Sequence, residues 1–286
     1  MTRLSISVVI PAKNEARNLE KLLPRLKAAL PDAELLVVND GSEDDTADVV
    51  ERFNVSCIHH EYSMGNGSAV KTGARAAKGE VLVFMDGDGQ HDPAQVKLLL
   101  DQIDRGADLV VGARNSKGQA SIGRQLANNF YNWFGSLVTG FKIQDLTSGF
   151  RAVKASKFRQ FLNLLPNGFS YPTTSTMAFL RSGYVVKFVP IEVEKRDGKS
   201  HIRPIKDGIR FLLIIFKVAT LYSPLKVFVP LAAVSFVLGL SRYAYTYWLD
   251  GTFTNMSALL LIASVQIFLM GLVSEQITAL IYKDRD

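Results

Sequence analysis

Two long apolar stretches near the end of the chain constrain its fold more than any other feature. Phe228–Trp248 and Met256–Tyr282 each reach the roughly 20 apolar residues that a helix needs to cross a bilayer. Inside hydrocarbon every backbone N–H and C=O needs an internal partner, which a helix supplies and an open sheet does not. The short polar link Leu249–Asn255 between the two stretches therefore predicts a transmembrane helical hairpin.

Charges around the hairpin predict its orientation. The link between the two stretches has no Lys or Arg, whereas five basic residues lie on the outer sides of the pair: Arg210, Lys217, Lys226, Lys283 and Arg285. Cytoplasmic loops of membrane proteins carry an excess of Lys and Arg. No signal peptide is recognisable before the first strand-like run. We therefore expect a multi-pass protein of the cytoplasmic (inner) membrane, with both chain ends and the large N-terminal part in the cytoplasm.

Two charged residues, Arg242 and Glu275, fall inside the predicted spans. With a helical rise of about 1.5 Å per residue, Arg242 lies roughly 10 Å from the outer end of the first span, and Glu275 roughly 10 Å from the inner end of the second. These different depths argue against a pair within one chain. Each side chain is expected either to reach its nearest interface or to pair with a second copy, and the latter would support a homo-oligomer.

The part of the chain before the hairpin alternates between strand-like and helical patterns. Short β-type runs occur at Ile6–Ile10, Leu35–Val38, Val55–Ile58, Val81–Met85 and Leu109–Gly112. Helical spacing or helix-start residues separate them. This alternation predicts an α/β domain with a mainly parallel sheet and helices on both faces.

Helix-start signals refine this pattern. Pro24 is expected to kink or shorten the first helix, and Ser42 is a candidate cap of the second. Asp92 with Pro93 is a cap and first-turn pair for a helix that runs to about Arg105.

Weaker patterns follow. Helices are expected around Arg124–Thr139 and Thr173–Arg181. The basic, amphipathic segment Ile205–Tyr222 is typical of a helix on the cytoplasmic membrane surface, with an ordinary packed helix as the alternative. Three parts are expected: a cytoplasmic domain (1–202), an interfacial helix with linker (203–226) and the transmembrane hairpin (227–286).

Polar segments follow three of the predicted strands, at Pro11–Glu15, Asn39–Ser42 and Asp86–Gln90. Ligands of open parallel sheets bind beyond the carboxyl ends of the strands, so the three segments are expected to share one cleft. A net charge of +6 suits an anionic partner, either a phosphorylated ligand or an acidic bilayer surface. Nucleic acid fits less well, because no Lys/Arg-rich block is interleaved with aromatic residues.

The third segment has the composition of a metal site. Asp86 and Asp88 alternate along the chain, and Gln90 follows two residues later. Oxygen ligands without His or Cys favour Mg²⁺ or Mn²⁺ over zinc. Either carboxylate alone would be an ordinary turn residue, but the position after an apolar run and before a capped helix favours the metal site.

The first two segments have the composition of a nucleoside pocket. Asp40 ends a strand, where its carboxylate can accept a hydrogen bond from a nucleobase N–H, with turn formation or helix capping as the alternative. Pro11, Lys13, Asn14 and Glu15 follow the first strand, and Glu15 can instead cap the first helix. The glycine-rich Gly65–Ala69 lacks the third glycine of a dinucleotide fingerprint and predicts mainly a tight turn into a helix.

Taken together, these motifs resemble a known family. VVIPAKNE (Val8–Glu15), NDGS (Asn39–Ser42) and DGDGQHDP (Asp86–Pro93) are similar to the family 2 inverting glycosyltransferases, which have a nucleotide-sugar-binding, Rossmann-like fold of GT-A type. LTSGFR (Leu146–Arg151) and RDGKS (Arg196–Ser200) resemble the branch that contains dolichyl-phosphate mannose synthases and bacterial undecaprenyl-phosphate sugar transferases.

The resemblance implies roles for individual residues. Those expected to contact the nucleotide sugar are Pro11, Lys13, Asn14, Glu15, Val38, Asp40, Asp86 and the backbone of Gly87. Asp86, Asp88 and Gln90 are expected to bind the metal ion and the diphosphate. Basic positions near the sugar phosphate or acceptor phosphate are Arg114, Arg151, Arg196 and Lys199. The chain departs from the family pattern at Asn39, where many members have Asp, and at His201, where Lys is frequent.

The expected reaction is inverting transfer of a sugar from a nucleotide sugar to a polyprenyl phosphate. UDP-sugar with undecaprenyl phosphate is favoured by resemblance; GDP-sugar and dolichyl phosphate are the other options. Asp88, Arg114 and Asp145 are the expected catalytic residues, and Asp145 serves either as a base or by orienting Arg151 or another cation. The alternatives are transfer to a lipid or polysaccharide hydroxyl, and a non-catalytic, membrane-anchored nucleotide-sugar-binding subunit.

Overall fold

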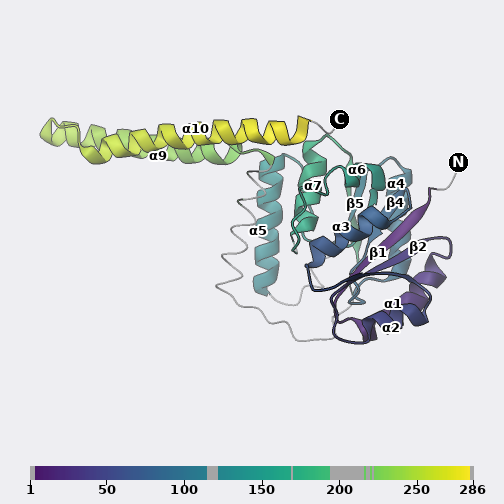
Figure 1. The fold of residues 1–286 in the computed structure, drawn as a ribbon. Helices are drawn as coiled ribbons and strands as arrows, with labels where there is room; N and C mark the ends of the chain where they lie inside the picture. Colours follow the sequence, from purple (N-terminus) through teal and green to yellow (C-terminus); the bar gives the residue numbers. More distant parts are fainter. Residues whose placement is uncertain are drawn as a thin grey trace. The chain divides into compact units, whose positions relative to one another are not determined.

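The computed structural model describes residues 4–114, 122–168, 170–193, 216, 220 and 222–283, with only the backbone described for 122–128 and 283. Contacts divide the chain into two compact units, Met1–Ser136 with Phe141–Ile202, and Leu137–Gly140 with Arg203–Asp286. Figure 1 labels the elements along the chain. Helix α5 (Ile122–Thr139) ends in the short piece that is counted with the second unit.

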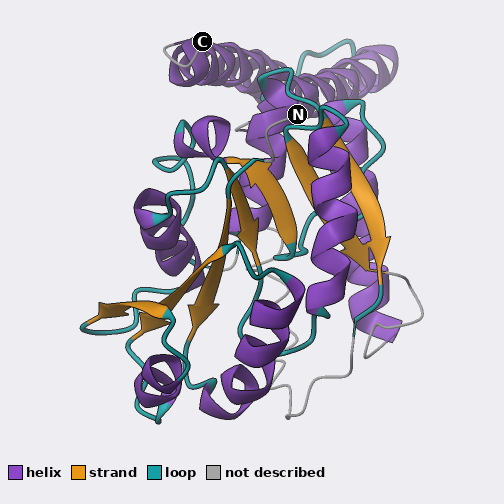
Figure 2. Cartoon of the chain, turned by 90° about the vertical axis from the view of Figure 1, so that its right-hand side faces the viewer, coloured by secondary structure: helices purple, strands orange, loops and turns teal. Residues whose placement is uncertain are grey.

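Seven strands of the described chain form one sheet in the first unit, in the order β3-β2-β1-β4-β6-β5-β7 (Figure 2). The strands are β1 (Ile6–Ala12), β2 (Glu34–Asp40), β3 (Ser56–His60), β4 (Val81–Phe84), β5 (Leu109–Arg114), β6 (Arg151–Lys154) and β7 (Val186–Ile191). β6 runs antiparallel to its neighbours β4 and β5, whereas the other pairings are parallel. The predicted mainly parallel sheet is confirmed, with β6 and β7 as additions that sequence patterns did not locate.

Helices cover both faces of the sheet. They are α1 (Ala16–Ala29), α2 (Thr46–Arg52), α3 (Asn66–Ala76), a 3₁₀ turn η1 (Pro93–Gln95), α4 (Val96–Asp104), α6 (Ala155–Arg159) and α7 (Tyr171–Arg181). Val8 and Ile10 pack with buried residues of α1, α2 and α4. Val9 points the other way, where a Cβ on Gly73 of α3 would lie 2.3 Å from its Cγ1. Because β1 is covered on both sides, its sequence is a continuous apolar run instead of an alternating one.

Two of the predicted helix-start signals and the effect of Pro24 can be compared with the observed helices. Asp92 accepts a hydrogen bond from the Ala94 N–H at 3.1 Å, and Pro93 begins the turn that leads into α4, as predicted. The predicted Ser42 cap is wrong: α2 begins at Thr46, and the Ser42 hydroxyl instead accepts from the Asn14 N–H. Pro24 lies inside α1 without ending it, since the helix continues to Ala29.

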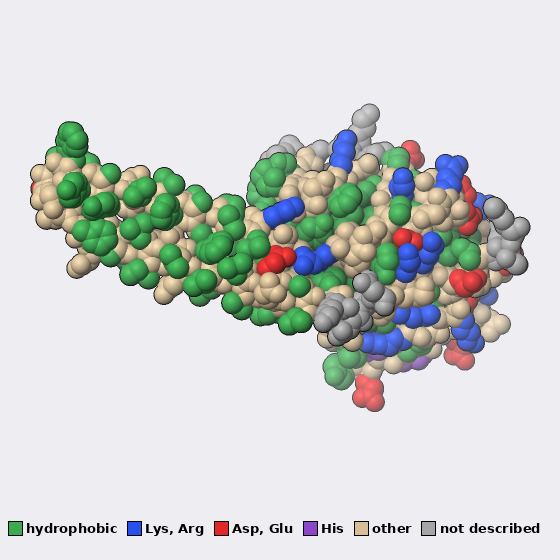
Figure 3. Space-filling view, turned by 90° about the horizontal axis from the view of Figure 1, so that it is seen from above, with side chains coloured by type: hydrophobic (Ala, Val, Ile, Leu, Met, Phe, Trp, Pro, Cys, Tyr) green, Lys and Arg blue, Asp and Glu red, His purple; other side chains and the backbone are tan. Residues whose placement is uncertain are grey.

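The second unit contains the predicted hairpin. α9 (Leu225–Asp250) and α10 (Asn255–Lys283) have mean hydropathies of 1.7 and 2.3 in their candidate spans and are long enough to cross a membrane. Hydrophobic side chains dominate their exposed surface in Figure 3.

Glu275 of α10 has a partner within its own chain, because its Oε2 accepts from the Leu225 N–H at the start of α9 at 3.4 Å. The homo-oligomer expected from an intermolecular Glu275 pair stays a prediction. The predicted surface helix Ile205–Tyr222 lies outside the described residues, apart from residues 216, 220 and 222.

Candidate functional site

The three predicted polar loops are neighbours at the carboxyl edge of the sheet. β1 lies between β2 and β4 and is parallel to both, so the loops that follow them emerge on the same side. Asn14 has a left-handed φ of 56°, which Asn tolerates better than most residues. It joins the first two loops: its N–H donates to Ser42 Oγ at 2.9 Å, and its Oδ1 accepts from the Glu43 N–H at 2.8 Å. A Cβ on Gly87 would lie 3.4 Å from the Pro11 carbonyl, which brings in the third loop.

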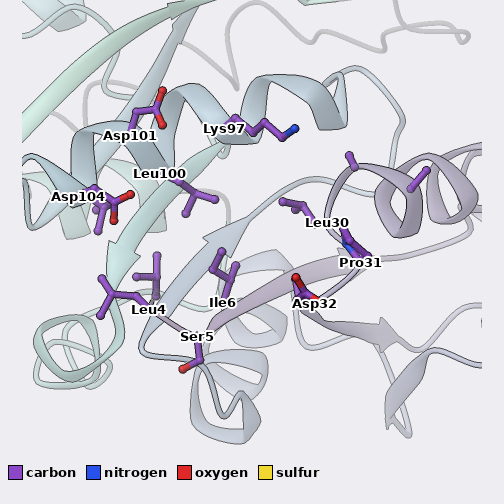
Figure 4. A pocket seen from close by; sticks show the side chains of 15 residues that line it. Leu4, Ser5, Ile6, Leu30, Pro31, Asp32, Lys97, Leu100, Asp101 and Asp104 are labelled. Carbon is purple, nitrogen blue, oxygen red and sulfur yellow. The ribbon is translucent and has the colours of Figure 1, made fainter. Parts of the chain in front are cut away.

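A hollow of about 780 Å³ lies at the opposite edge of the sheet. Figure 4 shows Leu100 of α4 pointing toward Leu4 and Ile6, which lie just before and at the start of β1. None of the predicted site residues lines it. The hollow is therefore separate from the candidate site.

Asp86, Asp88 and Gln90 follow β4 and are all half-buried. Asp88 Oδ1 accepts from the Gln90 N–H at 3.1 Å, which folds this loop back on itself, and Gly89 has a φ of 73°. Among the described residues there is no group of three or more His, Cys, Asp or Glu side chains placed to hold a metal ion.

Two carboxylates and an amide nevertheless fit Mg²⁺ or Mn²⁺, because such ions usually take one or two carboxylates and complete their shell with phosphate oxygens and water. The donor set of this loop thus suits a cation that arrives with a diphosphate. It does not suit a cation held by the protein alone.

Asp40 is buried and already engaged within the chain. Its Oδ1 accepts from the Met64 N–H at 2.8 Å and faces His60 Nδ1 at 2.7 Å. Its Oδ2 accepts from the Ser63 hydroxyl at 2.8 Å and the Gly65 N–H at 2.9 Å. Burial alone would raise the pKa of Asp40, but these hydrogen bonds outweigh it and lower the pKa.

A carboxylate has about four lone-pair positions, so these four contacts account for the acceptor positions of Asp40 in this conformation. A direct contact between Asp40 and a nucleobase would have to replace one of them, and it stays a prediction. The carboxylate ties β2 to the loop that leads into α3, where Gly65, with a φ of 98°, precedes the helix as predicted.

Asp145 and Arg114 form a two-pronged ion pair. Arg114 Nε lies 2.8 Å from Asp145 Oδ2, and an Arg114 terminal nitrogen lies 3.0 Å from Oδ1. The carboxylate also accepts from the N–H groups of Thr147 and Ser148 and from the Thr147 hydroxyl. Burial opposes ionisation of Asp145, but its hydrogen bonds to Arg114 prevail and lower its pKa. Of the two predicted roles for Asp145, this geometry matches the orienting one, with Arg114 as the oriented cation.

Arg151 is buried inside the first unit. Its side chain is 0% exposed. Its guanidinium donates to the Pro172 carbonyl at 2.9 Å, to the Ser175 hydroxyl at 2.7 Å and to the Ser148 carbonyl. No part of the Arg151 side chain reaches the surface in this structure, so its contact with an acceptor phosphate stays a prediction.

The remaining predicted residues divide into two groups. Pro11 and Val38 are buried within β1 and β2, and Lys13 is exposed beyond β1. Glu15 precedes α1 but makes no side-chain capping bond; its carboxylate accepts from the Asn18 amide instead. Nucleoside contacts of these residues stay predictions. The predicted basic residues Arg196 and Lys199 lie outside the described residues.

The sequence patterns did not predict one close neighbour of the loop Asp86–Gln90, which is called the acidic loop below. Gly149 lies against the Asp86 carboxylate, so that an added Cβ would be 2.8 Å from Asp86 Oδ2. Its only signal in the sequence was membership of the Leu146–Arg151 motif, which gave no indication of which residue faces Asp86.

His91 gives the site region a pH-dependent stability. It is 6% exposed and stacks on Phe150 with ring centroids 4.8 Å apart. Burial lowers its pKa to about 4. In the unfolded chain the pKa of a histidine is about 6.5, so below that pH the unfolded chain takes up a proton that the folded chain does not. The free energy of unfolding is therefore highest above about pH 6.5 and decreases as the pH falls toward about 4.

We therefore expect the free energy of unfolding to fall by about 2 kcal/mol, because of His91, when the pH is lowered from about 7 to about 5. Urea unfolding of the detergent-solubilised chain, followed by circular dichroism, measures this loss. His91→Phe keeps a ring against Phe150 and should remove that part of the pH dependence, whereas His59→Gln, on an exposed side chain, should retain it. Equal pH dependence in wild type and His91→Phe would contradict the assignment.

Comparisons with known proteins agree with this arrangement. The chain is 34% identical over 212 residues to the undecaprenyl-phosphate mannosyltransferase of Micrococcus luteus, covering 69% of this chain and 87% of that protein. It is 31% identical over 205 residues to the polyprenol monophosphomannose synthase of Mycolicibacterium smegmatis, covering 66% and 77%.

Among solved structures, glucosyl-3-phosphoglycerate synthase from Mycobacterium tuberculosis, in complex with Mn²⁺, UDP and phosphoglyceric acid, is similar with a TM-score of 0.61. The identity is 22% and the match covers 76% of this chain and 78% of that one, so it shows the fold alone. The second unit matches the GtrB C-terminal hairpin over residues 223–280. Residues 7–162, which include the acidic loop and the Arg114–Asp145 pair, match the family model of glycosyl transferase family 2, to which the chain belongs.

Proposed function

We propose that the protein transfers a hexosyl or pentosyl group, with inversion, from a nucleotide sugar to a polyprenyl phosphate at the cytoplasmic face of a membrane. A UDP-sugar is the favoured donor and a GDP-sugar the second choice. The observation that carries the proposal is the acidic loop Asp86–Gln90 within electrostatic reach of a cation, Arg114, that Asp145 holds in place, in a chain that also has a membrane hairpin. The polyprenyl-phosphate transferases among the relatives support the acceptor, and UDP in the solved relative supports the donor.

Asp86, Asp88 and Gln90 would hold Mg²⁺ or Mn²⁺ together with the donor diphosphate. When bound, the ion would neutralise charge that develops on the leaving diphosphate. Mn²⁺ in the solved relative supports this choice of ion.

Arg114 supplies a permanent positive charge beside the acidic loop. Burial alone would lower its pKa, but the Asp145 carboxylate raises it, with a smaller contribution from Asp86. A guanidinium that is held by both prongs of a carboxylate loses little freedom when it binds a phosphate oxygen. We assign Arg114 to the sugar phosphate or the acceptor phosphate, with Asp145 as the residue that fixes its orientation.

The acceptor itself is the nucleophile. A phosphate monoester has a second pKa of about 6 and is largely a dianion at neutral pH. Its oxygen attacks the anomeric carbon from the face opposite the diphosphate; the new C–O bond forms as the bond to the diphosphate breaks, and the configuration inverts. No proton has to be removed, which agrees with an Asp145 whose oxygens already accept several hydrogen bonds.

The test is a transfer assay with the purified full chain in detergent, Mn²⁺ or Mg²⁺, a short polyprenyl phosphate and a panel of UDP- and GDP-sugars. We expect a glycosylated lipid phosphate by mass spectrometry, with the anomeric configuration opposite to that of the donor by NMR. The matched polyprenol, which lacks the phosphate, is the control acceptor.

Three results would contradict the proposal. Transfer to the polyprenol would favour a hydroxyl acceptor. Binding of a nucleotide sugar without transfer to any acceptor would favour a non-catalytic subunit. Retention of configuration would exclude the single displacement.

A further inference from the structure

The Asp86 carboxylate rests against the bare Cα of Gly149. A Cβ added to Gly149 would lie 2.8 Å from Asp86 Oδ2 and 3.3 Å from both Cγ and Oδ1. All three atoms of the carboxylate group thus face this one position. Contacts below about 3.4 Å between a methyl carbon and such atoms are repulsive, so a side chain at residue 149 and the present position of Asp86 exclude each other.

Backbone conformation does not explain this glycine. The described glycines with left-handed φ are Gly41, Gly65, Gly89, Gly106, Gly140, Gly183 and Gly251. Gly149 is not among them, so a left-handed φ is not what favours glycine at this position. What residue 149 requires is empty space on the side of Asp86.

The segment that carries Gly149 has little room to move away. The Ser148 N–H donates to Asp145 Oδ1 at 3.1 Å, and the Ser148 carbonyl accepts from the buried Arg151 guanidinium. The Gly149 carbonyl accepts from the hydroxyl of Tyr171, which is 1% exposed, at 3.4 Å. On the other side, the Phe150 carbonyl accepts from the Gly112 N–H at 2.9 Å. A larger residue at 149 would therefore displace the half-buried Asp86 more readily than its own backbone.

We propose that Gly149 is a positioning residue whose missing side chain sets where the Asp86 carboxylate lies, and thereby the affinity of the acidic loop for its divalent cation. This inference rests on the proposed function of Asp86 as a metal ligand. Groups that orient a ligating carboxylate from behind typically change metal affinity 10- to 100-fold when they are altered, so roughly that loss is expected here.

The experiment measures Mn²⁺ binding directly. Full-length protein in detergent, with UDP present, is titrated with Mn²⁺, and free Mn²⁺ is quantified by electron paramagnetic resonance. Gly149→Ala is expected to raise the Mn²⁺ dissociation constant roughly 10- to 100-fold. Sugar transfer should recover substantially when Mn²⁺ is raised to saturation, which a general folding defect would not allow.

Two other glycines supply matched controls. A Cβ on Gly168 meets nothing within 4 Å, so Gly168→Ala should change neither Mn²⁺ affinity nor melting temperature. A Cβ on Gly271 of α10 would lie 2.6 Å from Phe228 Cβ and 3.3 Å from Phe228 Cγ, which is similar crowding without a carboxylate and outside the segment that holds Gly149. Gly271→Ala should lower the melting temperature and leave the Mn²⁺ dissociation constant of the folded protein unchanged.

The outcomes separate the two proposals. If wild type binds Mn²⁺ and Gly149→Ala binds it equally well, the positioning role is overturned while the proposed metal site stands. If wild type binds no Mn²⁺ in the presence of UDP, the metal site itself is overturned, and the inference with it. Should Gly149→Ala not fold, Tyr171→Phe replaces it: loss of the hydroxyl that anchors Gly149 is expected to give a smaller rise in the dissociation constant, and an unchanged value overturns the role.

Discussion

Replacing Asp88 with alanine is expected to lower kcat/KM for sugar transfer at least about 1,000-fold, which corresponds to about 4 kcal/mol of transition-state stabilisation. The substitution removes one of the two carboxylates of the acidic loop. It also removes the acceptor for the Gln90 N–H, so the third proposed ligand loses its support. Transfer of radiolabelled sugar to a short polyprenyl phosphate, at saturating Mn²⁺, measures the loss.

Asp92 provides the matched control for this substitution. It lies four residues further along the chain and caps the turn before α4. Asn caps helices about as well as Asp, so Asp92→Asn keeps this contact. It weakens only the exposed pair with Arg25, which at 3.2 Å on the surface is worth about 1 kcal/mol or less. Activity should stay within about twofold of wild type, whereas an Asp88→Ala variant within about tenfold of wild type would exclude a metal-holding role for Asp88.

The parts of the fold that sequence patterns predicted are those with local signals. β1, β2 and β4 are apolar runs covered by helices on both sides, and α9 and α10 are long apolar segments. In such segments a few neighbouring residues are enough to specify the element. The position of the site followed from the same patterns, because parallel strands place their following loops at one edge.

β6 had no such signal. It has four residues, begins with a charged one and inserts antiparallel between β4 and β5. Its register depends on pairs distant in sequence, such as Leu82 with Val153 and Val110 with Ala152. Only the assembled sheet specifies such pairs.

Arg151 and Asp40 show the same limit for side chains. A charged residue in a family motif is naturally interpreted as a ligand contact. In this structure Arg151 donates to the first turn of α7, and Asp40 accepts from the loop that leads into α3. Both roles depend on partners more than 20 residues away, which spacing along the chain does not reveal. Gly149 was missed for the converse reason, because its role is an absence of atoms.

Replacing Asp145 with asparagine is expected to lower kcat/KM about 100-fold without changing the shape of its pH profile. The substitution removes the negative charge and one of the two oxygens that hold Arg114, and a misplacement of about 1 Å in a positioning contact typically costs about 100-fold. In both proteins kcat/KM should rise with pH through about 6, where the acceptor phosphate loses its second proton, and then level off. The measurement is kcat/KM from about pH 5 to about pH 9 for wild type and variant.

If Asp145 acted as a base, the Asp145→Asn variant would lack its proton acceptor, and kcat/KM would keep rising above neutral pH as hydroxide replaced the carboxylate. The substitution Asp108→Asn is the control that distinguishes a loss of positioning from a loss of stability. The Asp108 side chain is 7% exposed and pairs with Lys154 at 2.9 Å, much as the 6% exposed Asp145 pairs with Arg114 at 2.8 Å. Breaking either pair should cost about 1–3 kcal/mol of stability, because each carboxylate is buried while its cation is about one-third exposed. Only Asp145→Asn should also lower the activity of the molecules that remain folded, because only its partner lies beside the acidic loop.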